Sequence, residues 1–281
     1  MSLLTPLVTI AGESLGKTID KLNFKRNNIE PASLIFLIFS SMLLCLLVLI
    51  FFTKPSLPQF GFEIIGLILL MILVSLWQNI FDFTGLKYKD LSFREPIYNF
   101  QPIMAGFIAF LVFPSERDIV ILFAIVVWAL ILYIGNNGTK LRLKFDKWAL
   151  FILCAMMCSS ILVNIYKFGL EHIEPAYLFL FRVCGILVFI PIIQNVHFSK
   201  MRAPHIRYWL SSGCVYFCSF FFKLISIATL GLNATILVLL FWPVCTYFLS
   251  SFVLKEEITL RKIVMSVLLI FIIVWAFYPV S

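Results

Sequence analysis

The chain has 281 residues, of which 62% are hydrophobic and 13% charged, and its mean hydropathy is +1.04. Soluble domains contain about 45–50% apolar residues and about a quarter charged residues. The composition therefore excludes a soluble enzyme, a disordered chain and a protein that binds nucleic acid. The net charge of +8 comes mainly from residues between apolar runs. These features predict an all-α, multi-pass protein embedded in membrane lipids.

Ten apolar runs in chain order predict ten transmembrane helices. They cover residues 2–19, 32–53, 62–85, 91–113, 118–136, 148–168, 175–196, 208–229, 232–254 and 259–278. The first run contains Glu13, Lys17 and several glycine and serine residues, so we expect it to avoid lipid. The second run has no charge between Leu34 and Phe52, and we expect it to face lipid.

The two halves of the chain share a pattern that predicts a duplication. Ile29-Glu30-Pro31-Ala32 recurs at 173–176, an offset of 144, and Pro102 with Glu116 recurs as Pro243 with Glu257, an offset of 141. The longest polar connection lies near the midpoint. We therefore expect a first five-helix repeat at 1–136, a cytoplasmic linker at 137–147 and a second five-helix repeat at 148–281.

The distribution of basic residues predicts the orientation of the repeats. Loops after the odd-numbered spans hold fifteen Lys and Arg residues, whereas loops after the even-numbered spans hold only Lys54, Arg117 and Lys167. Because the basic side is cytoplasmic, both termini are expected outside. A five-helix repeat crosses the membrane an odd number of times, so the second copy must be inverted. Inverted-topology repeats are typical of secondary transporters.

Seven charged residues fall inside the predicted spans. Each would cost about 2.5–3.5 kcal/mol at the centre of the bilayer if it had no partner. We therefore expect these residues to face one another or a wet cavity, with substrate-binding roles. They are Glu13, Lys17, Asp82, Arg94, Glu95, Arg182 and Lys223.

Three uncharged polar residues extend this candidate cavity. Gln78 shares a helix face with Asp82, and Tyr98 shares one with Arg94. Asn164 corresponds to Asp20 at the offset of 144, and it can either line the cavity or form a helix–helix hydrogen bond.

Four motifs in and beside the predicted spans belong together. They are Phe83 to Tyr88, Gln101-Pro102 with Glu116, Pro175 to Arg182, and Pro243-Val244 with Lys255-Glu256-Glu257. Together they resemble the ten-span, EamA-like family of the drug/metabolite transporter superfamily. That family has a small-Leu-Lys-Tyr turn after its third span, a proline in its fourth span, a glutamate ending that span, and a Pro…Arg segment opening its seventh span.

The segment from Ala11 to Thr18 resembles the first helix of the small multidrug resistance branch, in which a glutamate binds protons and cationic drugs. The resemblance gives that role to Glu13, and Lys17 departs from the pattern. A proton is therefore a candidate coupling ion, and a proton-coupled exporter of cations or amines stays open as an alternative.

The resemblance implies alternating access around a central cavity, transport of a small polar or charged metabolite, often export, and no cofactor. Arg94, Arg182 and Lys223 suit a carboxylate or phosphate. Glu13, Asp82 and Glu95 suit an amine. We expect Glu13–Lys17 and Asp82–Lys223 to be internal ion pairs that solute displaces. Pro102 and Pro243 are the expected hinges.

Other functions of the same chain remain alternatives at this stage. A flippase for a lipid carrier or a lipid-linked metabolite would need a lateral opening, and a scaffold would gain nothing from buried charges. An intramembrane protease is suggested by the EExxxR pattern at 256–261, but further metal ligands are missing.

The seven cysteines lie in apolar runs, so no metal site is expected. Short loops favour a bacterial plasma (inner) membrane, and both a monomer and a homodimer remain open.

Overall fold

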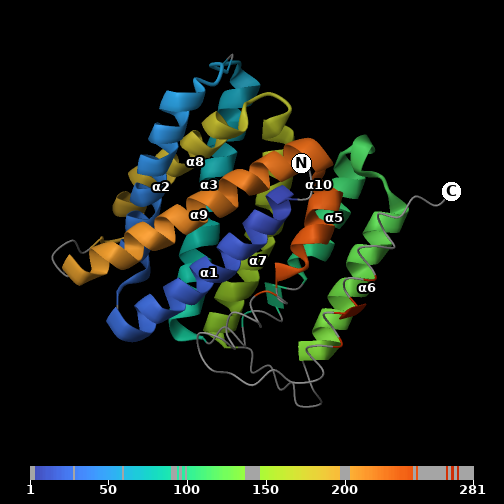
Figure 1. Cartoon of the computed structure of the whole chain (residues 1–281), viewed down its shortest axis with the longest axis horizontal. Helices are drawn as coiled ribbons and strands as arrows, with labels where there is room; N and C mark the ends of the chain where they lie inside the picture. The colour runs from blue at the N-terminus through green and yellow to red at the C-terminus, as the bar shows by residue number, and fades with distance from the viewer. Residues whose placement is uncertain are drawn as a thin grey trace.

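The computed structural model describes residues 4–27, 29–58, 60–89, 100–136, 146–196 and 203–242, together with Arg94, Ile97, Tyr98 and five isolated positions nearer the C-terminus. Over these residues the chain is all-α (Figure 1). The helices are α1 (Leu4–Asn27), α2 (Pro31–Thr53), α3 (Phe62–Tyr88), α5 (Gln101–Val112), α6 (Ile119–Asn136), α7 (Lys147–Leu170), α8 (Pro175–Ile193), α9 (Ala203–Leu230) and α10 (Leu232–Leu239), and a 3₁₀ turn covers Pro114–Glu116.

The helices agree with the predicted spans in place, and differ from them at several ends. Helix α1 continues to Asn27 rather than stopping at residue 19, and α9 begins at Ala203. In the fourth predicted span, α5 begins only at Gln101, so Pro102 lies in its first turn rather than inside a continuous helix. Proline is well tolerated there because the first turn needs no N–H donor. The tenth span and most of the ninth lie outside the described residues.

Five helical segments within the described residues are long and apolar enough to cross a membrane. They are α2, α3, α7, α8 and the Leu210–Leu230 part of α9. Helix α2 differs from the lipid-facing helix expected. Its first half is buried against α8 and α9, and mainly its second half exposes large apolar side chains, including Val48, Phe51 and Phe52.

Helices from the two halves of the sequence pack against each other in pairs (Figure 1). Helix α1 packs on α9, α3 packs on α7, and α2 packs on both α8 and α9. Glycine allows the close approach in the first two pairs. A Cβ at Gly12 of α1 would lie 2.7 Å from the Cβ of Ser219, and one at Gly85 of α3 would lie 2.6 Å from Cγ1 of Ile152. Small residues at helix crossings are the usual solution in membranes.

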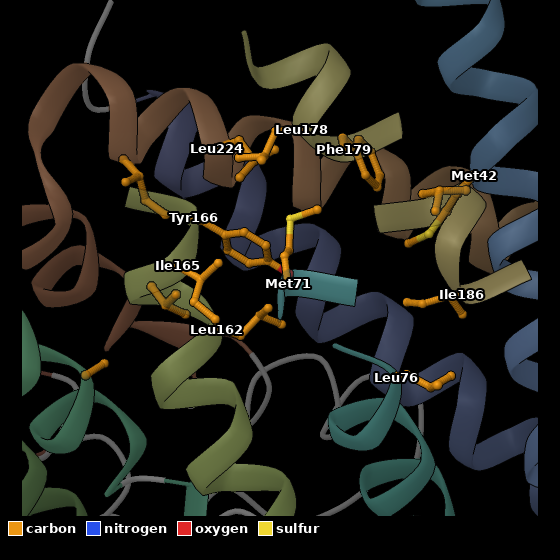
Figure 2. Close-up of a cluster of buried hydrophobic side chains, with 14 of the residues drawn as sticks. Met42, Met71, Leu76, Leu162, Ile165, Tyr166, Leu178, Phe179, Ile186 and Leu224 are labelled. Carbon is orange, nitrogen blue, oxygen red and sulfur yellow. The ribbon is translucent and has the colours of Figure 1, made fainter. Parts of the chain in front are cut away.

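An apolar cluster fixes the helices that carry the charged residues. Figure 2 shows Met42 of α2, Met71 and Leu76 of α3, Leu162 and Tyr166 of α7, and other side chains gathered between the helices. Met71 and Phe179 of α8 are fully buried. Because such packing leaves few voids, the polar side chains beside it are held in defined places.

The repeated tetrapeptide has one local structure in both halves. Helices α2 and α8 begin at Pro31 and Pro175, each after an extended glutamate, with φ −76° and ψ 144° at Glu30 and φ −60° and ψ 145° at Glu174. Proline suits the first helical position because its φ is already helical. The sequence repeat therefore marks equivalent helix starts.

Helix α7 begins with a charged cap outside its apolar span. The carboxylate of Asp146 accepts a hydrogen bond from the Ala149 N–H at 3.0 Å and pairs with Lys89 Nζ at 2.7 Å. The Lys89 ammonium, and then the Ala149 N–H, hold the pKa of Asp146 below its ordinary value. This pair links the end of α3 to the start of α7.

Candidate functional site

A cavity of about 120 Å³ lies among α1, α2, α3, α7, α8 and α9, with Arg94, Tyr98 and Gln101 completing its wall. It brings together eight of the ten residues that the sequence singled out for binding. They are Glu13, Lys17, Gln78, Asp82, Arg94, Tyr98, Arg182 and Lys223. Residues far apart in the sequence thus meet at one polar site inside an apolar protein.

Asp82 is the most densely paired charge in the cavity. Its Oδ1 and Oδ2 accept hydrogen bonds from Nε and Nη2 of Arg94 at 2.7 and 2.9 Å, and Oδ2 also lies 2.9 Å from Lys17 Nζ. The Arg94 guanidinium lies 3.6 Å from the centre of the Tyr98 ring. Both Asp82 and Arg94 are buried. This arrangement neutralises the carboxylate from two sides.

The pairing differs from the one expected from the sequence. Glu13 pairs with Lys223 at 3.3 Å rather than with Lys17, and Asp82 pairs with Lys17 and Arg94 rather than with Lys223. The reason is packing. Because α9 packs on α1 and α3 packs on α7, Lys223 faces Glu13 across the α1–α9 contact. Equivalent positions in a repeat do not have to touch.

Arg182 is buried beside the same cavity with a different set of partners. Its Nε donates a hydrogen bond to Ser75 Oγ at 2.7 Å, and its guanidinium lies 4.1 Å from the centre of the Phe220 ring. No carboxylate oxygen among the described residues lies within 4.0 Å of it. Arg182 is thus held by a hydroxyl and aromatic rings, and its charge has no close counter-ion in the part of the chain described.

A smaller cavity of about 50 Å³ adjoins the first. Glu13, Lys223 and Trp242 line both, so the Glu13–Lys223 pair stands where the two cavities meet. Pro102 lines only the smaller one, which extends along α10 toward Leu232. The ion pair therefore lies at the junction of the two cavities, together with Tyr98, Gln101 and Val163.

Beyond the smaller cavity, Glu116 closes the start of α10. Its two carboxylate oxygens accept hydrogen bonds from the backbone N–H groups of Leu232 and Asn233 at 2.6 and 2.8 Å, and Lys167 Nζ lies 3.4 Å away. Gly231 precedes them with φ +84°, a conformation that favours glycine. We call this arrangement the Glu116 clamp. It joins the end of α5 to α7 and α10, a role that neither the internal repeat nor the family resemblance had indicated for Glu116.

Asn164 does not line either cavity. Its side-chain amide donates to the carbonyl of Ala105 on α5 at 3.2 Å and to that of Ser160 on its own helix at 2.9 Å. Of the two roles the sequence left open, this is the helix–helix hydrogen bond. Glu95 and Pro243 lie outside the described residues.

Several cavity residues were missed by the sequence analysis. Tyr216 and Phe220 of α9 line the main cavity, and both lie on the helix face of Lys223, seven and three residues before it. This helical spacing from Lys223 is the sequence signal that could have identified both residues. Asp20 was also missed as a partner: its buried carboxylate accepts hydrogen bonds from the hydroxyls of Tyr216 and Ser212 at 2.5 and 3.1 Å. Nothing in the local sequence distinguishes it.

Comparison with known proteins relates the second half of the chain to a transporter family. Residues 146–278 match the model of the EamA-like transporter family. The second half of the chain is thus similar to this family. The family expected from the sequence is thereby confirmed over the matched residues, and this family implies a transporter rather than an enzyme. None of the curated proteins matches the chain.

The fold of the whole chain is shared with solved structures. One, described only as a crystal structure of a protein, matches with a TM-score of 0.78 and 9% sequence identity. The alignment covers 98% of this chain and 96% of that one. At such identity the likeness concerns the fold alone. It extends over the first half, which the family match does not reach.

Proposed function

We propose that this protein is a secondary transporter that moves a small polar or charged metabolite across the plasma (inner) membrane by alternating access, in the direction of export. The observation that carries the proposal is the buried cavity with ionised side chains from α1, α3, α8 and α9. Charged side chains are costly inside a membrane, and their gathering around one cavity is typical of a solute pathway. The EamA-like match supports the same function.

The proposed architecture is two inverted five-helix repeats, 1–136 and 148–281, joined by a cytoplasmic linker at 137–147. The packing supports this because several contacts recur with the halves exchanged. The α1–α9 contact corresponds to α7–α3, α2–α9 to α8–α3, and α5–α7 to α10–α1. With ten spans in this arrangement, both termini lie outside, and the solute binds between the repeats.

In this scheme the route outward runs from the main cavity, past Glu13–Lys223, into the smaller cavity and to the Glu116 clamp. The clamp lies on the side whose loops are poor in basic residues, which is the outer side. The described conformation is then closed at its outer end. Solute displaces the Glu13–Lys223 pair, and movement at Pro102 and Pro243 opens the clamp.

Proton coupling has one observation in its favour. The side chain of Glu13 is 24% exposed and lies at the junction of the cavities, whereas that of Asp82 is 2% exposed and held by two cations. Glu13 is therefore the carboxylate that a proton can reach. A pH gradient is expected to drive transport in the native protein and not in Glu13→Gln.

Efflux from proteoliposomes tests the proposed function. The full chain is reconstituted into vesicles loaded with a uniformly ¹³C-labelled bacterial metabolite extract, and solutes released over time are identified by mass spectrometry. We expect a small subset of polar solutes to leave faster than from protein-free vesicles, and expect this release to fall when Lys223 is replaced by Gln. If no labelled solute leaves faster, with or without a pH gradient, the proposal is wrong.

A further inference from the structure

We infer that the main cavity selects small organic anions, and that Arg182 binds their oxyanion head. The inference rests on the proposed transport function and narrows its substrate class. It comes from a difference among the cations in the cavity: each of the others has a carboxylate partner, and Arg182 has none among the described residues.

The setting of Arg182 is that of a prepared anion site. Arg182 is 6% exposed, and its Nε donates a hydrogen bond to the Ser75 hydroxyl at 2.7 Å. The centre of the Phe220 ring lies 4.1 Å from the guanidinium, within the range of a cation–π contact. With Nε engaged, the two terminal nitrogens remain to donate in parallel, which is the geometry that carboxylates and phosphates accept.

The charge balance of the cavity points the same way. Its described lining residues carry four cations, Lys17, Arg94, Arg182 and Lys223, against two carboxylates, Glu13 and Asp82. Both carboxylates are already paired. A cationic solute would therefore have to displace an existing partner, whereas an anion reduces the excess of positive charge by entering.

The remaining wall predicts the other end of the solute. Phe39, Tyr166 and Phe220 surround the guanidinium, and the buried Tyr166 hydroxyl makes no hydrogen bond within the described residues. An apolar body of a few carbons fits against the rings, and the phenol can donate a further hydrogen bond to the anion. The expected solute is therefore an anion with a short apolar body.

Four probes with a short alkyl chain and different polar groups test this substrate class. They are butanoate, butyl phosphate, butanamide and butylammonium. Binding to the purified full chain is measured by the shift of the thermal unfolding midpoint across a concentration series. We expect one or both anions to bind, and the amide and the amine to bind at least about tenfold more weakly. The two anions distinguish a carboxylate site from a phosphate site.

The variant Arg182→Gln is expected to weaken anion binding by about 10–100-fold, and Arg182→Lys by less. Arg117→Gln, at an exposed arginine outside the cavity, is the matched control and should leave binding unchanged. Circular dichroism confirms that each variant is helical. If Arg182→Gln does not fold, the Arg182→Lys variant and the relative affinities of the four probes test the inference instead.

Two results would overturn the anion inference. One is that neither anion binds, and the other is that the amide or the amine binds as well as the anions do. The efflux experiment keeps this failure separate from failure of the transport proposal. Release of only neutral or cationic metabolites would retain the transporter and reject the anion. Anion binding without release of any metabolite would retain the anion site and reject the transporter.

Discussion

Asp82 and Arg182 face the same cavity and are buried to a similar degree, but their charges are balanced very differently. Asp82 is bound by Arg94 and Lys17, with three contacts between 2.7 and 2.9 Å. Arg182 has one hydroxyl partner and three aromatic rings. A buried, balanced cluster holds helices together, whereas an unbalanced charge persists only where a ligand completes it. We therefore expect the Asp82 cluster mainly to hold the helices together, and we propose that Arg182 binds the solute.

The largest expected effect comes from removing the balance at Asp82. Asp82→Asn leaves Arg94 and Lys17 buried without their carboxylate, and we expect it to lower the free energy of unfolding by about 3–5 kcal/mol. The measurement is the thermal unfolding midpoint of the purified protein. Glu63→Gln, at an exposed carboxylate on the same helix, should change it little.

A double variant separates lost charge balance from lost packing. Adding Arg94→Gln to Asp82→Asn removes one of the two stranded cations, so part of the lost stability should return. Arg182→Gln alone should cost much less than Asp82→Asn, since no carboxylate is stranded. If the two single variants cost the same, the distinction between the two regions fails.

A smaller effect is expected from the helix contact that places Glu13. A methyl group at Gly12 would lie 2.7 Å from Ser219 Cβ and 3.0 Å from the Val215 carbonyl oxygen, so Gly12→Ala must move α1 away from α9. We expect a loss of about 1–3 kcal/mol in unfolding free energy, typical of overpacking. The shift also separates Glu13 from Lys223, so the apparent affinity for solute should change.

Gly66→Ala is the matched control for Gly12→Ala. A Cβ at Gly66 would meet nothing within 4 Å, so this variant should gain about 0.5–1 kcal/mol from helix propensity. Loss of stability in both variants would mean that the α1–α9 contact is not specially tight.

The helices and the charged cavity could be predicted from the sequence because both follow from local rules. Apolar runs of helix length indicate spans, and charged residues inside them must find partners or water. Eight of the ten chosen residues accordingly line one cavity. The turn at Phe100, which separates α5 from Arg94, was not predicted. A proline near the middle of a span, such as Pro102, is compatible either with a kink in one helix or with the start of a second helix.

The partners of the charges could not be predicted, for a physical reason. Asp82 and Lys223 are equivalent by repeat, but contact depends on which helix faces lie together. That is decided by small residues such as Gly12 and Gly85, whose role appears only once the helices are packed. The Glu116 clamp was hidden likewise, since its main partners are backbone N–H groups, which every residue but proline has.

The Glu116 clamp extends the comparison of Asp82 with Arg182, because here backbone N–H groups stabilise a buried carboxylate. Glu116→Gln keeps the shape of the side chain but replaces one acceptor oxygen by a donor, so we expect a loss of about 1 kcal/mol. Hydrogen exchange read by mass spectrometry should be faster at the amides of Leu232 and Asn233. Glu171→Gln, at an exposed carboxylate after α7, should leave that exchange unchanged. Unchanged exchange in both variants would mean that the clamp does not hold α10.

The smallest effect is expected where the same kind of ion pair is exposed. Lys89 holds the pKa of Asp146 below its ordinary value of 3.8. A carboxylate with a lowered pKa stabilises the folded state above that ordinary value, and the contribution is lost as pH falls through the lowered pKa. The unfolding midpoint should thus fall slightly more on acidification below about pH 4 in the native chain than in Asp146→Asn. Because water and salt screen this pair, added salt should weaken its effect but leave that of Asp82 almost intact. Equal salt sensitivity at both carboxylates would mean that burial does not set Asp82 apart.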